Sequence, residues 1–427
     1  MSDRLPAGAT VALRYGRGTL PLALPCDADV IRPRHSAALA DPAGAIAAAL
    51  RSPLAGPPLR DLVPPGARVG VSVCDVTRPF PSRLVLPVLL DAIPDAHVTV
   101  FVATGTHRAC TPEELDAMLG PAVLARVAVV QHDAFDAGAH APLGIIPGSS
   151  GVTAMVDAGF LAQDVRITLG FIEPHFFAGF SGGPKMVAPG LASIETVLEL
   201  HSAARVGHPR ATFGALAGNP LHEGIAAIAA LADIAFSLDV TLNDRHEVTA
   251  VYAGAPWEAH ARGCDVVRET AMERVAAPYD IVVTTNSGYP LDQNLYQAIK
   301  GVCAAAGIVR DGGAILVAAE CADGLPAHGR YRSLLERWGS PAAYLAALDS
   351  GEVRVHDQWQ VQKQALVLER ARVLVHADGL TDAEIRGAWL EPAPDVAASL
   401  AALVADYGPG CRVAVLPEGP QSIAFLA

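Results

Sequence analysis

Lysine is scarce in this sequence, which has only three among its 427 residues, at Lys185, Lys300 and Lys363. Acidic side chains outnumber basic ones by 44 to 31, so the formal net charge is −13, and no basic stripe interrupts the excess. This balance argues against a nucleic-acid-binding protein, because the phosphate backbone attracts positive surfaces. A site for an anionic substrate therefore has to be built locally, from a few cations.

Long apolar runs are missing as well. No stretch of about 18 uncharged apolar residues occurs, so we expect no membrane-spanning helix. The first 25 residues lack a charged start followed by an apolar segment, so we expect no secretory signal and a cytoplasmic location.

Cysteine pairs with metal-binding or redox spacing are absent. The seven cysteines are scattered without a CxxC motif, which favours reduced, mostly buried thiols over disulfides or a zinc site. No HExxH motif occurs either, so any metal would need ligands that are distant in the sequence.

What the sequence does contain is a regular alternation of apolar strand-like runs and helices. After some 65 irregular, proline-rich residues with one helix (41–53), strands are predicted at 67–76, 96–105, 127–133 and 164–172. Helices at 191–204, 219–231 and 256–273 follow, with two strands around the turn "LNDRHE". Such an alternation predicts a mostly parallel sheet with helices on both faces.

A second unit of the same kind is predicted from residue 278 onward. It comprises strands at 278–290, 313–320, 371–377 and 412–417, with helices at 292–306 and 357–370. We therefore expect an α/β protein of two domains, residues 1–277 and 278–427, each with a mostly parallel sheet flanked by helices. The active site is expected in the cleft between them, and the oligomeric state is not indicated.

The loops that leave the carboxyl ends of parallel strands are where ligands bind in such folds. The first of these, "DVTRP", contains Asp75, Thr77 and Arg78. Arginine can hold a carboxylate or phosphate through two parallel hydrogen bonds, and Asp or Thr can hold a sugar hydroxyl. The alternative is a structural turn, in which the aspartate caps a helix and the arginine forms a surface ion pair.

The second loop, "ATGTHRA", contains Gly105, Thr106 and His107. A glycine allows the backbone to approach a ligand, and a histidine at this edge suits acid–base catalysis near neutral pH. The spacing is not that of a dinucleotide fingerprint, and a purely structural histidine remains the alternative.

The third loop, "EPHFFAGFSGGPKMVAPG" (173–190), combines His175 with Lys185 on a glycine–proline turn. Its lysine is followed by Met186, so this is not a Walker loop. A desolvated lysine can lose its proton and act as a nucleophile, whereas an ordinary exposed lysine on a turn is the alternative. His201 follows sixteen residues later on the apolar face of the predicted helix, where a core histidine is the alternative reading.

In the second domain, the segment "LYQAIKG" places Tyr296, Gln297 and Lys300 on one helix, with Tyr296 and Lys300 one turn apart. Trp359 lies in the polar sequence "HDQWQVQ", an unusual setting for a large aromatic side chain.

Taken together and in this order, "DVTRP", "GTHR", "EPHFFAGFSGGPK", the later histidine, "YQAIK" and the late tryptophan resemble the nickel-pincer lactate racemase family. The resemblance spans residues 75 to about 360.

The resemblance implies a nickel-pincer nucleotide, pyridinium-3-thioamide-5-thiocarboxylic acid mononucleotide, covalently attached at Lys185, with His201 as the protein ligand to nickel. It implies His107 and His175 as the acid–base pair. It also implies cofactor contacts from Asp75, Thr77, Gly105 and Thr106, and substrate contacts from Arg78, Lys300, Gln297, Trp359 and Tyr296. Maturation would require the enzymes that synthesise the cofactor.

The implied reaction is the racemisation or epimerisation of a 2-hydroxy acid, through hydride removal from the α-carbon and a planar 2-keto acid. Hydride removal avoids a carbanion beside a carboxylate, and two histidines suit a reaction that must run on both faces. Two alternatives stay open: a lyase or aldolase that uses Lys185 as a Schiff base, and an inactive paralogue that binds a small molecule. The identity of the hydroxy acid is not indicated.

Overall fold

Two separate sheets, of six and seven strands, organise the described residues. The computed structural model describes residues 2–34, 36–326 and 329–426. One unit, here called the Lys185 unit, consists of the described residues of His35–His201 and Arg210–Arg268. The other, the Lys300 unit, consists of the described residues of Met1–Arg34, Ser202–Pro209 and Glu269–Ala427.

The sheet of the Lys185 unit is parallel except at one edge, where β14 runs antiparallel to β13. Its strand order is β14 (Val248–Gly254), β13 (Phe236–Leu242), β10 (Val165–Phe171), β5 (Arg68–Cys74), β6 (His97–Ala103) and β7 (Ala128–Gln131). The four strands predicted first in the sequence are confirmed as β5, β6, β7 and β10. The central strand β5 is buried from Val69 to Cys74, which explains its continuous apolar sequence.

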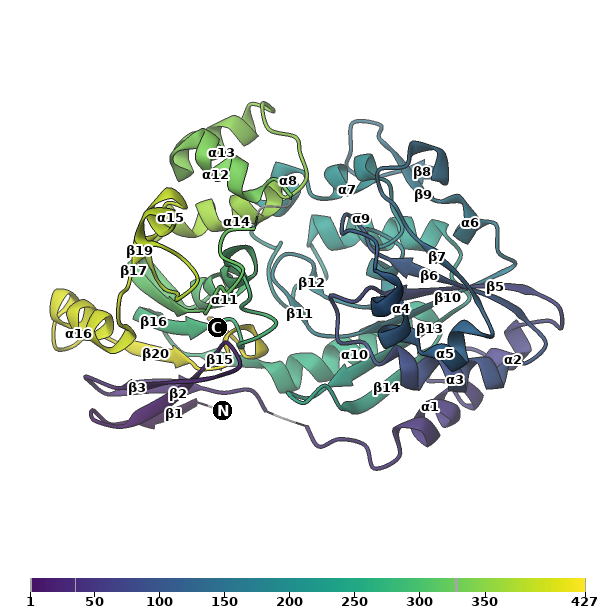
Figure 1. Ribbon diagram of the computed structural model, residues 1–427, viewed down its shortest axis with the longest axis horizontal. Helices are drawn as coiled ribbons and strands as arrows, with labels where there is room; N and C mark the ends of the chain where they lie inside the picture. The colour runs from purple at the N-terminus through teal and green to yellow at the C-terminus, as the bar shows by residue number, and fades with distance from the viewer. Residues whose placement is uncertain (1, 35, 327–328, 427) are drawn as a thin grey trace. The chain divides into compact units, whose positions relative to one another are not determined.

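Helices and short elements surround this sheet, and Figure 1 draws α1, α3 and α5 along one side of it. The helices are α1 (Pro42–Arg51), α2 (Leu59–Leu62), α3 (Ser82–Ala92), α4 (Pro112–Leu119), α5 (Pro121–Leu124), α6 (Ala158–Leu161), α7 (Ile194–Leu200), α9 (Pro220–Leu231) and α10 (Pro256–Ala271). The shorter elements are η1 (Ala137–Ala139), β8 (His140–Ile145), β9 (Thr153–Asp157), β11 (Pro174–His175), β12 (Gly179–Phe180) and η2 (Gly183–Met186). Apolar residues of α1 and α3, among them Ile46 and Leu89, pack against the strands in one core.

The sheet of the Lys300 unit has a parallel centre and one antiparallel edge pair, β1 with β4. Its order is β1 (Ser2–Leu5), β4 (Ala28–Ile31), β20 (Val413–Leu416), β16 (Tyr279–Thr285), β17 (Val309–Ala318), β18 (Ala371–His376) and β19 (Glu391–Pro392). Because β4 pairs with β20, the first 34 residues group with this unit, although the division at 277/278 placed them with the earlier part of the chain. That division stays a prediction.

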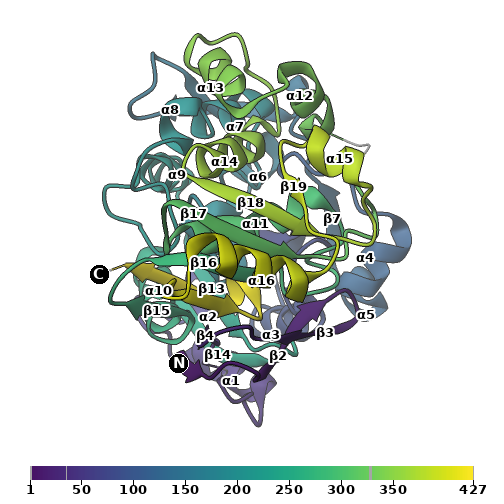
Figure 2. The same cartoon turned by 90° about the vertical axis from the view of Figure 1, so that its left-hand side faces the viewer.

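Alternating side chains of the central strands serve two cores. Val282 and Ile315 face a core with α11, α12, α13 and α14, whereas Val283 and Leu316 face α16 and the β2–β3 hairpin. Figure 2 shows α16 crossing one face of this sheet. The remaining elements are β2 (Thr10–Tyr15), β3 (Gly18–Ala23), α8 (Ala203–Val206), β15 (Met272–Val275), α11 (Leu295–Ala306), α12 (Tyr331–Trp338), α13 (Pro341–Asp349), α14 (Gln358–Leu368), α15 (Asp382–Gly387), α16 (Val396–Tyr407), η3 (Gly419–Gln421) and β21 (Ile423–Leu426).

Two predictions about local structure are wrong. The proline-rich first 65 residues contain four strands, because short segments such as "TVALRY" alternate buried and exposed side chains around tight turns. The helix predicted at 191–204 is two helices, α7 and α8, with His201 as the C-cap of α7. The imidazole Nδ1 of His201 donates to the carbonyl of Val197 at 2.8 Å and so occupies the last turn.

Candidate active site

Three loops of the Lys185 unit leave the same sheet edge, because β10, β5 and β6 are parallel neighbours. The "DVTRP" loop follows β5, the "GTHR" loop follows β6 and the stretch 173–190 follows β10. A hydrogen bond from Gly105 N to Gly190 O, at 3.0 Å, joins the second loop to the third. Strand β5 is bonded to the third loop as well, because Ser72 Oγ donates to Met186 O at 2.7 Å. The structure therefore assembles at one edge the candidate residues that the sequence places more than 100 positions apart.

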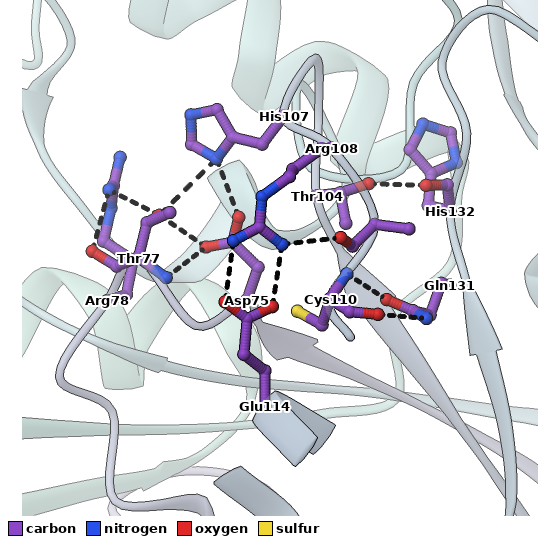
Figure 3. A network of polar contacts seen from close by, with 11 residues as sticks. Asp75, Thr77, Arg78, Thr104, His107, Arg108, Cys110, Glu114, Gln131 and His132 are labelled. Atoms are coloured by element: carbon purple, nitrogen blue, oxygen red, sulfur yellow. Dashed lines mark hydrogen bonds and ion pairs between the residues drawn. The ribbon is translucent and has the colours of Figure 1, made fainter. Parts of the chain in front are cut away.

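His107 and Asp75 form a hydrogen-bonded pair (Figure 3). The imidazole Nδ1 of His107 lies 2.7 Å from Asp75 Oδ2. The other carboxylate oxygen, Oδ1, accepts hydrogen bonds from the Thr77 hydroxyl at 2.6 Å and the Thr77 backbone N–H at 3.2 Å. Because the carboxylate can only accept, Nδ1 of His107 carries a hydrogen and the lone pair of the neutral ring is on Nε2. The side chain of His107 is 45 % exposed, whereas that of Asp75 is 4 % exposed, so the imidazole is accessible and its carboxylate partner is buried.

The charge of Asp75 is maintained by its partners. Burial by itself would raise the pKa of this carboxyl group, but the hydrogen bond and charge of His107, the charge of Arg78 and the bond from Thr77 outweigh it, and the pKa is lowered. A carboxylate that stays ionised fixes the tautomer of His107 and stabilises the imidazolium that forms when Nε2 takes a proton.

The two arginines of these loops are held differently. Arg108 makes a bidentate ion pair with Glu114, at 2.7 Å for both bonds, and the pKa of Glu114 falls to about 2 through that hydrogen bond. Arg78 uses only Nη1, which donates to the carbonyl and hydroxyl of Thr77. Among the described residues, Nε and Nη2 of Arg78 make no hydrogen bond, so one edge of its guanidinium is available to a carboxylate.

The turn that carries Lys185 is a tight glycine structure. Gly182 and Gly183 have φ values of 73° and 49°, in the left-handed region, and η2 begins at Gly183. The backbone carbonyl of Lys185 accepts from Gly190 N at 3.1 Å, which closes the loop behind the lysine.

His175 has the opposite tautomer from His107. Its Nδ1 accepts hydrogen bonds from the backbone N–H groups of Ala178 at 3.3 Å and Phe177 at 3.5 Å, so the hydrogen of the neutral ring is on Nε2. Phe177 lies between two histidines, with ring centroids 4.5 Å from His175 and 5.2 Å from His201. The aromatic sequence "HFF" therefore positions both candidate histidines.

His201 is a buried, neutral imidazole. Burial, reinforced by the charge of Lys185, lowers its pKa to about 4 against an opposing hydrogen bond to Val197. Since Nδ1–H donates to that carbonyl, the lone pair of the ring is on Nε2, the form in which histidine binds a metal.

Three residues near the turn were missed by the sequence analysis: Asp239, His260 and His222. Asp239 is fully buried on β13, and His260 on α10 is 4 % exposed. Burial, followed by the charges of His260 and Lys185, lowers the pKa of His222 to about 4. An aspartate inside the apolar strand "FSLDVTL" was the available signal for this cluster, because a charge in a buried strand is costly unless it is bonded.

Comparison with known proteins identifies the family of this chain. A model of the lactate racemase N-terminal domain matches residues 15–214, and a model of the lactate racemase C-terminal domain matches residues 274–424. The chain belongs to the lactate racemase family. Membership makes it an isomerase of the racemase class.

Similar proteins cover nearly the whole chain. The lactate racemase of Thermoanaerobacterium thermosaccharolyticum is 35 % identical over 380 residues, 88 % of each chain, and that of Lactiplantibacillus plantarum is 34 % identical over 376 residues. The second alignment covers 87 % of this chain and 88 % of its relative. The solved lactate racemase apoprotein of T. thermosaccharolyticum superposes with a TM-score of 0.91 at 33 % identity, over 97 % of this chain and all of that one. A Thermotoga maritima protein, at 20 % identity, a TM-score of 0.68 and 90 % and 98 % coverage, shares the fold.

The other residues that the family resemblance singles out lie in the Lys300 unit. Tyr296, Gln297 and Lys300 lie on α11 and are partly exposed, whereas the intervening Ala298 and Ile299 are buried. Trp359 on α14 is 6 % exposed. Their roles toward substrate stay predictions.

The described residues contain neither a multidentate metal cluster nor a membrane-spanning helix. No group of three or more His, Cys, Asp or Glu side chains is arranged to hold a metal ion within residues 2–34, 36–326 and 329–426. Over the same residues, no helix is both long and apolar enough to cross a bilayer.

Proposed function

We propose that this member of the lactate racemase family racemises or epimerises a 2-hydroxy acid, with lactate as the first substrate to test. The observation that carries the proposal is the Asp75–His107 pair at the same sheet edge as the Lys185 turn. The names of the relatives support the substrate class, and the finer steps below rest on the geometry of this chain.

The donor set fits a nickel-pincer nucleotide. Lys185 lies on a glycine turn beside His201, whose neutral ring directs its hydrogen to Val197 and keeps its lone pair on Nε2. A cofactor that brings its own sulfur and carbon ligands needs only one protein ligand, which agrees with a site that has no three-residue metal cluster among the described residues. In this proposal Lys185 anchors the cofactor, His201 binds its nickel, and Thr77, Gly105 and Thr106 contact the nucleotide. When bound, the cofactor would accept and return the α-hydrogen as hydride.

His107 acts as the base at Nε2. It takes the hydroxyl proton of the substrate, while Asp75 accepts from Nδ1–H and stabilises the imidazolium. Asp75, expected to contact the cofactor, is thus proposed to orient His107. After the planar keto acid has rotated to present its other face, a second histidine, which must be an imidazolium at that stage, gives a proton to the substrate oxygen. His107 then releases its proton to solvent and the second histidine takes one up, which restores the pair.

His175 is proposed for that second face. Its neutral ring presents Nε2–H, which can donate a hydrogen bond to the substrate oxygen. To take a proton at Nε2, it must first move its hydrogen to Nδ1, so the contacts with Ala178 and Phe177 have to break. The two histidines are therefore not equivalent in the resting enzyme.

The substrate carboxylate is assigned to Arg78, whose Nε and Nη2 edge is available. Lys300, Gln297, Tyr296 and Trp359 are proposed to complete substrate binding. The cofactor-synthesis enzymes as maturation partners and a cytoplasmic location stay predictions.

The test is to produce the chain with and without the cofactor-synthesis enzymes. We expect nickel, a mass increase on the Lys185 peptide, and loss of optical purity of D- or L-lactate only in the first preparation; a panel of other 2-hydroxy acids then ranks substrates. Active protein without nickel or adduct would refute the proposal. Borohydride trapping of a keto acid on Lys185 would instead identify a Schiff-base enzyme, and a loaded chain that racemises no acid in the panel would identify a binding paralogue.

A further inference from the structure

The Lys185 turn is seated directly on two buried polar side chains from other elements. A Cβ added to Gly182 would lie 2.5 Å from Asp239 Oδ1, and one added to Gly183 would lie 2.5 Å from the ring of His260. Gly170 on β10 is equally constrained, since its Cβ would lie 2.6 Å from Asp239 Oδ1. Glycine is required at all three positions because the backbone lies against side chains, and Gly182 and Gly183 are left-handed in addition.

Asp239 holds the turn by accepting a hydrogen bond from a backbone N–H group of the turn. Oδ1 accepts from Gly183 N at 3.0 Å, and Oδ2 accepts from Ser237 Oγ at 3.1 Å. Ser237 in turn accepts from Thr168 Oγ1 at 3.1 Å, so the carboxylate is oriented by hydroxyl groups of β13 and β10. The carboxyl group is fully buried. An apolar side chain at this position would pack within the sheet without the desolvation penalty that a buried charge incurs.

His260 holds the turn by a carbonyl group. His260 lies on α10, and its Nε2–H donates to Ser181 O at a distance of 2.9 Å. Ser181 is itself fixed, because its N–H donates to Glu173 O at 2.9 Å and its hydroxyl donates to Phe171 O at 2.8 Å. The backbone is therefore bonded on both sides of Gly182, three residues before the lysine.

We propose that Asp239 and His260 are positioning residues that fix the glycine turn, and thereby place the Lys185 amine for attachment of the cofactor. The inference rests on the proposed function. Neither residue contacts the reacting atoms in this scheme; each acts through the turn, by one hydrogen bond to the backbone.

Substitutions that keep or lose the single hydrogen bond test this. D239N retains an oxygen that can accept from Gly183 N–H, whereas D239A does not. In H260Q the amide Nε2 can occupy the place of the imidazole Nε2, whereas the shorter side chain of H260N cannot reach Ser181 O. H140A is the matched control, because His140 is also buried and bonds to a backbone carbonyl, that of Asp136, away from the turn.

Each variant is produced with the cofactor-synthesis enzymes, and three quantities are measured: the fraction of Lys185 adduct by intact mass, nickel per chain, and the thermal midpoint. We expect D239A and H260N to lose at least about tenfold in adduct fraction. D239N and H260Q should remain within about threefold of the parent chain, and H140A should load like it. The comparison of H260Q with H260N decides the matter even where alanine variants do not fold, because both introduce a polar amide.

Folded D239A and H260N chains that load as well as the parent would overturn the inference. So would a D239N or H260Q chain that loads as poorly as its partner variant, since the hydrogen bond would then not be what matters. A parent chain that carries no adduct, by contrast, refutes the proposed function itself.

Discussion

Replacing Asp75 by asparagine tests the His107 geometry more sharply than removing the side chain, because Thr77 dictates how the new amide sits. The Thr77 hydroxyl and N–H both donate to Oδ1, so this position must remain an oxygen. The amide NH₂ then faces His107 Nδ1 and donates to it. The imidazole hydrogen moves to Nε2, and the base nitrogen loses its lone pair.

The magnitude follows from two contributions. In D75N the imidazolium of His107 no longer has a carboxylate partner. A hydrogen bond to a charged group contributes about 1.5–3 kcal/mol, and its loss corresponds to about 10- to 150-fold in rate. Breaking the new neutral bond to restore the productive tautomer costs about 1 kcal/mol more, or about fivefold. We expect kcat of D75N to fall by about 10² to 10³, and kcat of D75A to fall less, because an exposed His107 without a partner can adopt either tautomer.

The assay is racemisation by chains loaded to the same adduct fraction, together with ¹⁵N chemical shifts of the His107 ring, which report the tautomer directly. A D75N chain with matched loading and thermal midpoint that retains more than a third of the parent activity would refute the reasoning. So would D75A that is less active than D75N, or an unchanged ¹⁵N tautomer signature in D75N.

Three further predictions concern the surroundings of Lys185. The pKa of His222 is about 4 in the folded chain against 6.5 ordinarily, so between those values the unfolded chain alone binds this proton and the free energy of unfolding decreases as the pH is lowered. H222Q should flatten the slope of unfolding free energy between pH 6 and 4.5 by about 1.4 kcal/mol per pH unit in urea titrations. G182A should lower the unfolding free energy by about 2–3 kcal/mol, through left-handed strain and the clash with Asp239, whereas G151A, with nothing near its Cβ, shows the strain alone. The apo chain should not bind Ni²⁺ from nickel chloride with the affinity of a multidentate site, because His201 is the one proposed protein ligand; calorimetric binding abolished by H201A would contradict this.

How much of the site the sequence predicts depends on whether the interaction is local. The strands β5, β6 and β10 are continuous apolar runs, so both their existence and the meeting of their loops at one edge were predictable. The capping box of α4, formed by Thr111 and Glu114 three residues apart, is a local interaction of the same kind. The end of α7 was not predictable, because it depends on the ring of His201 bonding to Val197, a choice that helix periodicity does not encode.

Interactions across long sequence distances were not predictable. Asp75 and His107 are on loops that follow neighbouring strands, and only the hydrogen bond between them shows that the carboxylate orients the imidazole. Asp239 and His260 are 56 and 79 residues from the backbone groups that they hold. A single sequence contains no signal for such pairings beyond an unexpected charge in an apolar strand.

The electrostatics around Lys185 explain why an anchored cofactor suits this turn better than a phosphate clamp. His201 and His222 both have pKa values lowered to about 4, mainly by burial and partly by the charge of the lysine, so neither adds positive charge at neutral pH. A phosphate site would gain from protonated imidazoles, whereas a nickel ligand requires a neutral one. The proposed attachment through the amine would remove the lysine charge, and with it one of the influences that lower the pKa of each histidine, while burial would continue to keep both rings neutral. The turn is therefore consistent with a lysine that is consumed by a covalent bond, next to an imidazole that must remain unprotonated.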